Sequence, residues 1–291
     1  MLSTIPPSRV SRSACRSTPR GYVAAKLQRE PHMDLGIRGR KAIVCASSRG
    51  LGRACAIALA EAGCDVVING MDAARVAAVA EEIAKATGAK VIGVAANVGT
   101  EEGRAKLIAA CPDPDILVNN NAGPPPKDFR QLTRDDMIAG VDANMMSPVL
   151  LTQKVIDGMV ERNFGRIINI TSGSVKMPLI GLDLSSGARA GLTAFFAGVA
   201  RQVAASNVTI NNLLPGPFET DRLRSAATSQ AKMRGVSYEE LQEQRKAGIP
   251  ARRFGQPEEF GKLCAFVASA HTGYITGQNF LIDGGAYPSA F

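Results

Sequence analysis

One stretch constrains the fold of this chain more than any other, residues 41–62, which read KAIVCASSRGLGRACAIALAEA. It opens with an apolar run, Ala42 to Ala46, that is too short for a helix and is typical of a buried parallel strand. A turn of serine and glycine follows, and from Ala54 onward apolar residues recur at helical spacing. Unpaired N–H groups and the helix dipole point into such a turn, so the stretch predicts a phosphate-binding site. The plainer alternative is a tight strand-to-helix turn without a ligand.

Two glycines have separate roles in this interpretation. Gly50 lets a pyrophosphate approach the backbone, and Gly52 permits close packing of the helix on the strand. The residues predicted to bind a dinucleotide here are Ser47, Ser48, Arg49, Gly50, Leu51 and Gly52.

Short apolar runs alternate with helical patterns along the rest of the chain. The predicted strands are 42–46, 66–68, 91–95, 116–118, 166–170, 209–213 and 279–282, and the later predicted helices are 73–86, 101–110, 148–162, 188–205 and 257–268. Strands that alternate with helices of this length indicate right-handed βαβ units and a parallel sheet. We therefore expect an α/β fold, a single doubly wound seven-stranded parallel sheet, with ligands at the carboxyl ends of its strands.

Residues 221–253 interrupt this alternation with a polar segment that is predicted to be helical in two pieces. Because it leaves the carboxyl end of a strand, we interpret it as a helical lid over the substrate. A solvated surface excursion is the alternative.

Residues 1–32 differ in composition from the rest. They hold six basic residues and one acidic residue, and so more than half of the net charge of +8. A mitochondrial-type targeting peptide, a disordered tail and a translated segment upstream of a true start at Met33 all fit this composition. We favour the last two, which leaves residues 33–291 as the folded domain. The modest charge of that domain argues against a nucleic-acid partner.

Several classes of site are disfavoured by composition. The chain has six cysteines without a CxxC pair, and only His32 and His271, so no metal site and no Ser-His-Asp triad is expected. Its apolar runs are shorter than the roughly 18 residues that a membrane span needs, so a soluble, cytoplasmic protein without a membrane partner is predicted.

Beyond the glycine turn, several motifs stand in a familiar order. They are Asn120-Asn121-Ala122-Gly123 after a strand, Asn144, the strand 165–170 leading to Thr171-Ser172, Pro215-Gly216-Pro217 with Thr220, and Asp283-Gly284-Gly285 near the end. Over nearly all of residues 34–291 the sequence resembles the short-chain dehydrogenases/reductases, and within them the 3-oxoacyl-acyl-carrier-protein reductases. The resemblance implies a Rossmann-fold oxidoreductase that uses NADP(H), with NAD(H) as the alternative, on a carbonyl, alcohol or 3-oxoacyl-thioester substrate. It also implies cofactor contacts from Asn97, Val98, Asn121, Ala122, Gly123, Arg189, Pro215, Gly216, Phe218 and Thr220.

The resemblance fails at the centre of the chemistry. The family's general acid is a tyrosine with a lysine four residues later, and here Ser185 and Arg189 occupy those positions. A serine hydroxyl is far less acidic than a phenol, and an arginine does not readily give up a proton. We predict that Ser172 and Ser185 orient the carbonyl, that Arg189 contacts the nicotinamide ribose, and that Asn144 supports a water relay. Asp183 and Lys176 remain alternative proton donors, and a non-catalytic dinucleotide-binding scaffold or sensor remains the alternative function.

Two further expectations concern the glycine turn and assembly. Ala46 stands where the family has its first glycine, and its methyl group fits only if φ there is negative. Arg49 can meet a 2′-phosphate, because no carboxylate follows the second strand before Asp72, so NADP(H) is favoured. The helices 148–162 and 188–205 are apolar around more of their surface than one sheet contact needs, and in the family both helices form a dimer interface. A homodimer, or a tetramer completed by residues 287–291, is therefore expected.

Overall fold

The computed structural model describes residues 33–290. The predictions for residues 1–32 and for Phe291 lie outside this range. Leu35 and the residues that follow it form one compact unit.

The unit is built on one sheet of seven parallel strands in the order β3-β2-β1-β4-β5-β6-β7. The strands are β1 (Lys41–Val44), β2 (Asp65–Gly70), β3 (Val91–Ala95), β4 (Ile116–Asn119), β5 (Gly165–Ile170), β6 (Val208–Pro215) and β7 (Asn279–Ile282). Ile43 in the middle of β1 pairs with Val67 of β2 on one side and with Leu117 of β4 on the other. The strand order reverses beside β1, which confirms the predicted doubly wound sheet.

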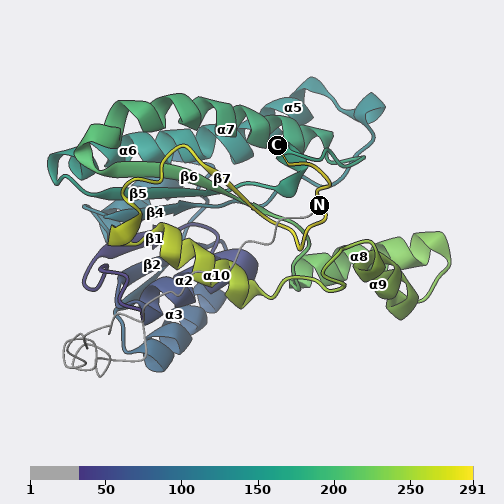
Figure 1. The fold of residues 1–291 in the computed structure, drawn as a ribbon, viewed down its shortest axis with the longest axis horizontal. Helices are drawn as coiled ribbons and strands as arrows, with labels where there is room; N and C mark the ends of the chain where they lie inside the picture. The colour runs from purple at the N-terminus through teal and green to yellow at the C-terminus, as the bar shows by residue number, and fades with distance from the viewer. Residues whose placement is uncertain (1–32, 291) are drawn as a thin grey trace, which may run out of the picture. The chain divides into compact units, whose positions relative to one another are not determined.

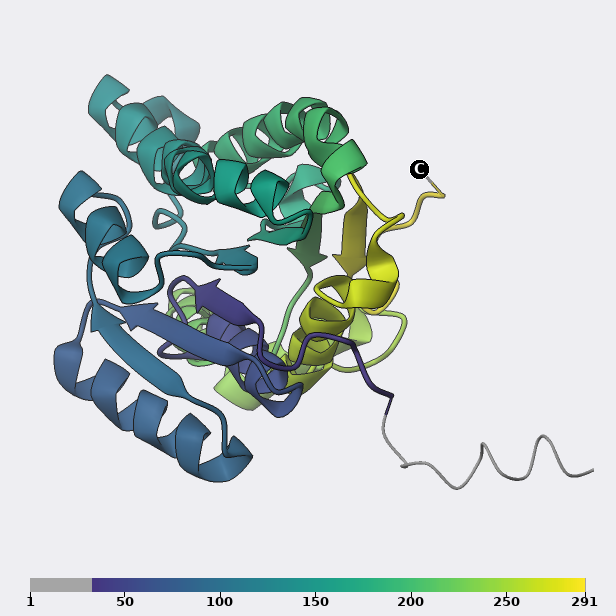
Figure 2. The same cartoon turned by 90° about the vertical axis from the view of Figure 1, so that its left-hand side faces the viewer.

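Helices cover both faces of the sheet, as Figure 1 shows, and the perpendicular view in Figure 2 shows the same three layers. One layer holds α2 (Gly50–Glu61), α3 (Ala73–Thr87) and α10 (Pro257–Val267), and the other holds α4 (Glu101–Ala110), α6 (Ser147–Glu161) and α7 (Asp183–Val203). Side chains alternate across β1, so Ala42 and Val44 join the first core while Ile43 joins the second. The inner strands of the sheet are thus buried on both faces, which explains their apolar sequence, whereas the edge strands β3 and β7 are partly exposed.

The structure differs from the sequence-based prediction in the region between β4 and β5 and at the start of α7. Helix α5 (Arg134–Val141), which begins with a capping box of Thr133 and Asp136, was not predicted. A π-helical turn, Asp142–Met146, joins it to α6. Helix α7 begins at Asp183 and not at the predicted residue 188. The helix begins earlier than predicted because its first turn carries polar residues, which hide the apolar pattern in the sequence.

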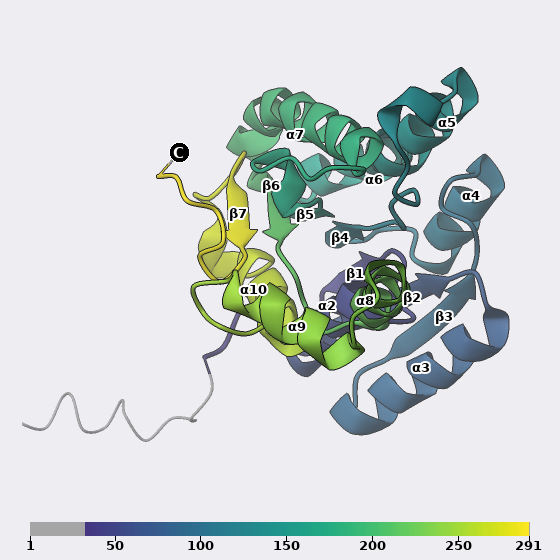
Figure 3. The ribbon, with the colours of Figure 1, turned by 90° about the vertical axis from the view of Figure 1, so that its right-hand side faces the viewer.

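Two helices stand apart from both layers, α8 (Asp221–Arg234) and α9 (Tyr238–Ala247) (Figures 1 and 3). They have a small core of their own, made of Ala227, Ala231 and Leu241. The prediction that residues 221–253 form two helical pieces is confirmed, and the chain enters them from the carboxyl end of β6.

Within residues 33–290, no helix combines the length and the apolar character that a bilayer span requires. The five cysteines of this range are buried and free.

Candidate functional site

The backbone of the turn between β1 and α2 leaves the N-terminus of α2 accessible to a ligand. Gly50 adopts a positive φ of 58°, and Arg49 caps α2 without a side-chain hydrogen bond. A Cβ atom on Gly52 would overlap the carbonyl oxygen of Ala46, so this position requires glycine. The first N–H groups of α2 therefore face outward at the turn, as an anion-binding helix N-terminus requires.

Ala46 overturns one expectation from the sequence. Its φ is 44°, in the left-handed region where a methyl group is disfavoured. Its N–H donates to Asn69 Oδ1 at 3.1 Å, and its carbonyl oxygen accepts from Asn120 Nδ2 at 3.2 Å. These two bonds from neighbouring strands hold the strained residue in place.

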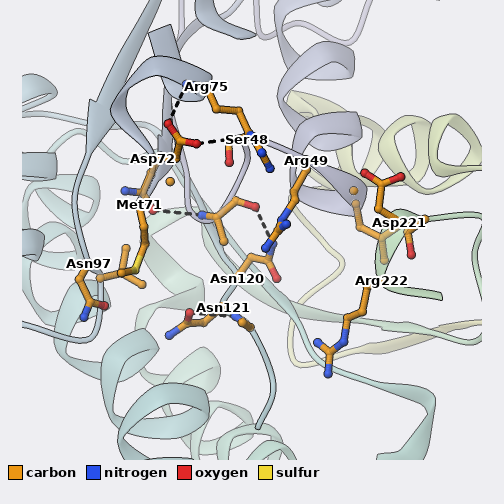
Figure 4. Close-up of a pocket in the computed structure, with 18 of the residues that line it drawn as sticks. Ser48, Arg49, Met71, Asp72, Arg75, Asn97, Asn120, Asn121, Asp221 and Arg222 are labelled. Carbon is orange, nitrogen blue, oxygen red and sulfur yellow. Dashed lines mark hydrogen bonds and ion pairs between the residues drawn. The ribbon is translucent and has the colours of Figure 1, made fainter. Parts of the chain in front are cut away.

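A cavity of about 840 Å³ opens over this turn at the carboxyl edge of the sheet (Figure 4). Nine of the predicted cofactor residues line it, namely Ser48, Arg49, Gly50, Leu51, Asn97, Val98, Asn121, Ala122 and Thr220. The sequence therefore located the main walls of the cavity.

The other predicted cofactor residues lie behind or beside these walls. Ser47 is fully buried under the turn, where its hydroxyl donates to the carbonyl of Val44 and accepts from the N–H of Asn69. Phe218 is also buried, with its ring edge-on against Phe260. Gly52, Gly123, Pro215 and Gly216 are outside the residues that line the cavity.

One end of the cavity is bordered by two arginines and one carboxylate. Asp72 caps α3, accepts from the N–H of Arg75 at 3.1 Å and lies 3.9 Å from the Arg75 guanidinium. Arg49 lies across from this pair in the cavity wall (Figure 4). Sequence reasoning missed Arg75, although its position in the first turn of α3, three residues after Asp72, was readable. Arg49 and Arg75 are thus the basic residues at this end, and Asp72 and Asp221 are the carboxylates of the cavity lining.

Arg189, like the other predicted catalytic residues Asn144, Ser172 and Ser185, is outside the residues that line the cavity. It binds three separate parts of the protein. Its Nε donates to Ser185 Oγ at 3.2 Å, its Nη1 to the Ile170 carbonyl at 2.7 Å, and its Nη2 to the Asn121 carbonyl at 3.3 Å. The side chain is only 7% exposed. Burial, and next the charge of Arg222, lower the pKa of Arg189 to about 10. Arg189 is therefore still a cation at neutral pH, and it connects α7 to the ends of β4 and β5.

The two candidate serines each accept a hydrogen bond from the protein. Ser185 Oγ accepts from Arg189, and Ser172 Oγ accepts from the N–H of Ser174 at 3.1 Å. In both cases the serine hydroxyl proton must point elsewhere. Ser186, the next residue on α7, differs because its hydroxyl donates to the Leu182 carbonyl at 2.9 Å.

Asn144 lies in the π-helical turn and is 2% exposed. Its Nδ2 makes a long hydrogen bond of 3.4 Å to the Gly140 carbonyl, while its Oδ1 is buried without a partner among the described residues. A buried amide oxygen of this kind is a site for an ordered water molecule.

Arg222, in the first turn of α8, is a site residue that sequence reasoning missed. A Cβ atom on Gly123 would lie 3.2 Å from Arg222 Nη2 and 3.4 Å from Ser185 Oγ, so both groups flank Gly123. Only the folded chain shows this proximity, because Gly123 follows β4 while Arg222 lies on α8, far along the sequence.

The comparisons with known proteins agree with this geometry. The family model described as Enoyl-(Acyl carrier protein) reductase, a short-chain dehydrogenase model, matches residues 45–287. The chain belongs to the short-chain dehydrogenase/reductase family.

Relatives within this family align over nearly their whole length. The 3-oxoacyl-(acyl-carrier-protein) reductase FabG of Aquifex aeolicus is 35% identical, over 88% of this chain and 100% of its own. The NADPH-dependent reductase BacG of Bacillus subtilis is 33% identical, over 86% of this chain and 98% of its own. The crystal structure of L-sorbose reductase from Gluconobacter frateurii, complexed with NADPH and L-sorbose, superposes with a TM-score of 0.84 at 26% identity, covering 88% of this chain and 100% of its own.

The residues of this short-chain dehydrogenase/reductase fit a dinucleotide. The glycine turn leaves no room for a side chain at Gly52, the cavity runs from the Arg49 and Arg75 end toward Asn121, and the helix N-terminus faces it. Ser185 and Arg189, the predicted catalytic pair, lie in the first two turns of α7.

Proposed function

We propose that this protein is an NADPH-dependent reductase of a carbonyl or 3-oxoacyl-thioester substrate, in which Ser185, oriented by Arg189, holds the reacting carbonyl oxygen. The observation that carries the proposal is the hydrogen bond from Arg189 Nε to Ser185 Oγ. Because Arg189 donates, the Ser185 hydroxyl is free to donate to a substrate, and the adjacent positive charge strengthens that bond.

NADPH, when bound, supplies the hydride to the carbonyl carbon. Ser185 and Ser172 hold the carbonyl oxygen with their hydroxyl protons while negative charge develops on it. Arg189 stays protonated and stabilises this charge, since its pKa, lowered to about 10 by burial, remains above neutral pH. A water molecule held by Asn144 Oδ1 delivers the proton that completes the alcohol. The N–H groups of Arg189 that make no bond within the protein remain for the nicotinamide ribose.

The preference for NADPH rests on the charged end of the cavity. Arg49 and Arg75 both line the cavity there, and only Arg75 lies near Asp72. A planar guanidinium can donate two parallel hydrogen bonds to the oxygens of a 2′-phosphate. The BacG and L-sorbose reductases named above also use or bind NADPH. NADPH should bind at least tenfold more tightly than NADH, and Arg49→Ala should reduce that ratio. An unchanged ratio in Arg49→Ala would exclude Arg49 from recognition of the phosphate.

The catalytic part of the proposal is tested by following NADPH oxidation with a panel of ketones and acyl-thioesters. Ser185→Ala should lower kcat about 10²-fold or more without changing the affinity for NADPH. Ser186→Ala is the matched control, because Ser186 is a neighbouring serine of α7 whose hydroxyl is bound to Leu182. Equal turnover by Ser185→Ala and the parent would refute the role of Ser185.

A non-catalytic scaffold or sensor is the second candidate function. It is favoured by the three bonds that Arg189 makes inside the protein, since these are also what a purely structural arginine would make. Tight NADPH binding without turnover on the whole panel would establish this alternative.

We also propose a homodimer or tetramer formed through α6 and α7, in the cytoplasm, with α8 and α9 of residues 221–253 acting as the lid. On α7, Phe195 is 43% exposed beside the exposed small residues Ala194, Ala197 and Gly198. A flat apolar helix face of this kind is suited to pack against its copy. Light scattering at micromolar concentration should give a dimer or tetramer mass, and Phe195→Asp should shift it to the monomer.

A further inference from the structure

Two guanidinium groups lie near Ser185, that of Arg222, which lines the cavity, and that of Arg189, which is buried outside the cavity lining. The charge of Arg222 helps to lower the pKa of the buried Arg189, and both side chains approach Ser185. Arg222 forms no ion pair with a carboxylate of residues 33–290. Figure 4 shows that the neighbouring carboxylate of Asp221 points in the opposite direction. This end of the site therefore has a surplus of positive charge that the protein itself leaves uncompensated.

The position of Arg222 separates it from the phosphate-binding turn. Thr220, the residue that caps α8, lies over Gly50, where a Cβ atom would be 3.8 Å from the Thr220 methyl group. The Arg222 guanidinium lies instead beside Gly123 and Ser185. Its charge is thus directed toward the reacting group and away from the turn.

The spacing of the donors suits a small bifunctional substrate. Arg222 Nη2 and Ser185 Oγ lie within 3.5 Å of the same point beside Gly123. A molecule that places a carbonyl oxygen at Ser185 and a carboxylate at Arg222 would bridge this gap. The short side chain of Ser185 leaves space there that a tyrosine ring would fill.

We propose that the substrate of this reductase is a 2-oxo acid, whose carboxylate is bonded directly to the reacting carbonyl carbon, and that Arg222 binds this carboxylate. The inference rests on the proposed function and names its substrate class. Arg222 lies in the first turn of α8, which belongs to the proposed lid. A substrate carboxylate bound to Arg222 would therefore hold this turn of α8 against the site.

The test measures binding and does not depend on turnover. The chain has no tryptophan, so the fluorescence of bound NADPH can be followed without that background. Oxamate, an unreactive oxo-acid analogue, and neutral oxamide are titrated into the NADPH complex of the full-length protein. Oxamate should bind 10- to 100-fold more tightly than oxamide, as expected for a charged hydrogen bond. Arg222→Met should abolish this difference, and Arg222→Lys should keep part of it.

Arg224→Met is the matched control, because Arg224 is an exposed arginine of the same helix outside the cavity lining. It should retain the parent's selectivity and NADPH affinity. Equal binding of oxamate and oxamide to the parent would overturn the inference. So would an Arg222→Met protein that loses NADPH affinity and keeps its selectivity for oxamate, because Arg222 would then hold a phosphate of the cofactor.

Turnover separates this inference from the proposed function. If oxamate selectivity depends on Arg222 but no oxo acid is reduced, the carboxylate site stands and the reductase proposal fails. If neutral ketones are reduced and oxo acids are not, with no oxamate selectivity, the reductase proposal stands and the oxo-acid inference fails.

Discussion

Arg189 should contribute more to the stability of the fold than to the affinity for the cofactor. Its three hydrogen bonds join α7 to the ends of β4 and β5, where the site is assembled. Replacing it with methionine keeps a long side chain but removes all three donors. We therefore expect Arg189→Met to be strongly destabilised, with Ser185 and the Asn121 backbone released together.

The expected loss of stability in Arg189→Met is the difference between the lost hydrogen bonds and the relieved cost of burying the guanidinium. Hydrogen bonds from a charged donor contribute about 1.5–3 kcal/mol each, so three give a gross loss of roughly 6 kcal/mol. Burial of the guanidinium, which lowers the pKa of Arg189 from 12.5 to about 10, offsets roughly 3 kcal/mol of this at 1.36 kcal/mol per tenfold change. The net loss is about 3 kcal/mol, which corresponds to a fall in Tm of about 6–12 °C for a domain of this size.

Calorimetry and urea unfolding of the parent, Arg189→Met, Arg189→Lys and Arg201→Met measure this effect. Lysine should recover part of the stability, because one ammonium group cannot reach all three acceptors in the planar arrangement of the guanidinium. Arg201, exposed in the last turn of the same helix, should have little effect when replaced. If Arg189→Met had the same unfolding stability as the parent but bound NADPH more than tenfold more weakly, the guanidinium would face the cofactor. The proposed role of Arg189 in stabilising the fold would then be refuted.

Three further predictions concern the turn and a surface ion pair. Ala46→Gly should stabilise the protein by about 0.5–1 kcal/mol in urea unfolding, because glycine adopts the φ of 44° without strain; a destabilised variant would contradict this. Gly52→Ala should cost about 2–3 kcal/mol and weaken NADPH binding, since its methyl group would overlap the Ala46 carbonyl; an unchanged Tm would count against the close packing. The ion pair with Arg253, and then the Gln256 backbone N–H, lower the pKa of Glu259 to about 2. The carboxylate therefore contributes stability above pH 4.5 that is lost as the pH falls toward 2, and Tm should depend less on pH over this range in Glu259→Gln than in the parent.

The sheet was predictable because its inner strands are buried on both faces and its edge strands are still short apolar runs. All seven appear in the sequence as short apolar runs, and the structure extends several of them by one or two residues. Helix α5 was missed because Arg134–Val141 is short and charged, without an apolar stripe. Its capping box of Thr133 and Asp136 was the one readable signal. The π-helical turn had no signal in the sequence, since its register breaks the helical period.

The site was predictable where a motif lies on one continuous segment. The family motif paired Ser185 with Arg189, and the structure shows that Arg189 Nε donates to Ser185 Oγ. Contacts between segments were not predictable. Arg222 reaches Ser185 from α8, and the Asn121 carbonyl accepts from Arg189, because the fold brings the ends of different elements together. The left-handed Ala46 also depends on partners in other strands.

The three hydrogen bonds of Arg189 depend on the shape of its guanidinium group. A guanidinium can donate to Ile170, Asn121 and Ser185 at once because its N–H groups diverge in one plane, which a lysine ammonium cannot reproduce. With a tyrosine at position 185, the ring would extend into the space that Arg222 and Gly123 border. A short serine keeps that space open and accepts the Arg189 bond. Ser185 thus lies near two cationic side chains, the buried Arg189 that donates to it and Arg222 of α8.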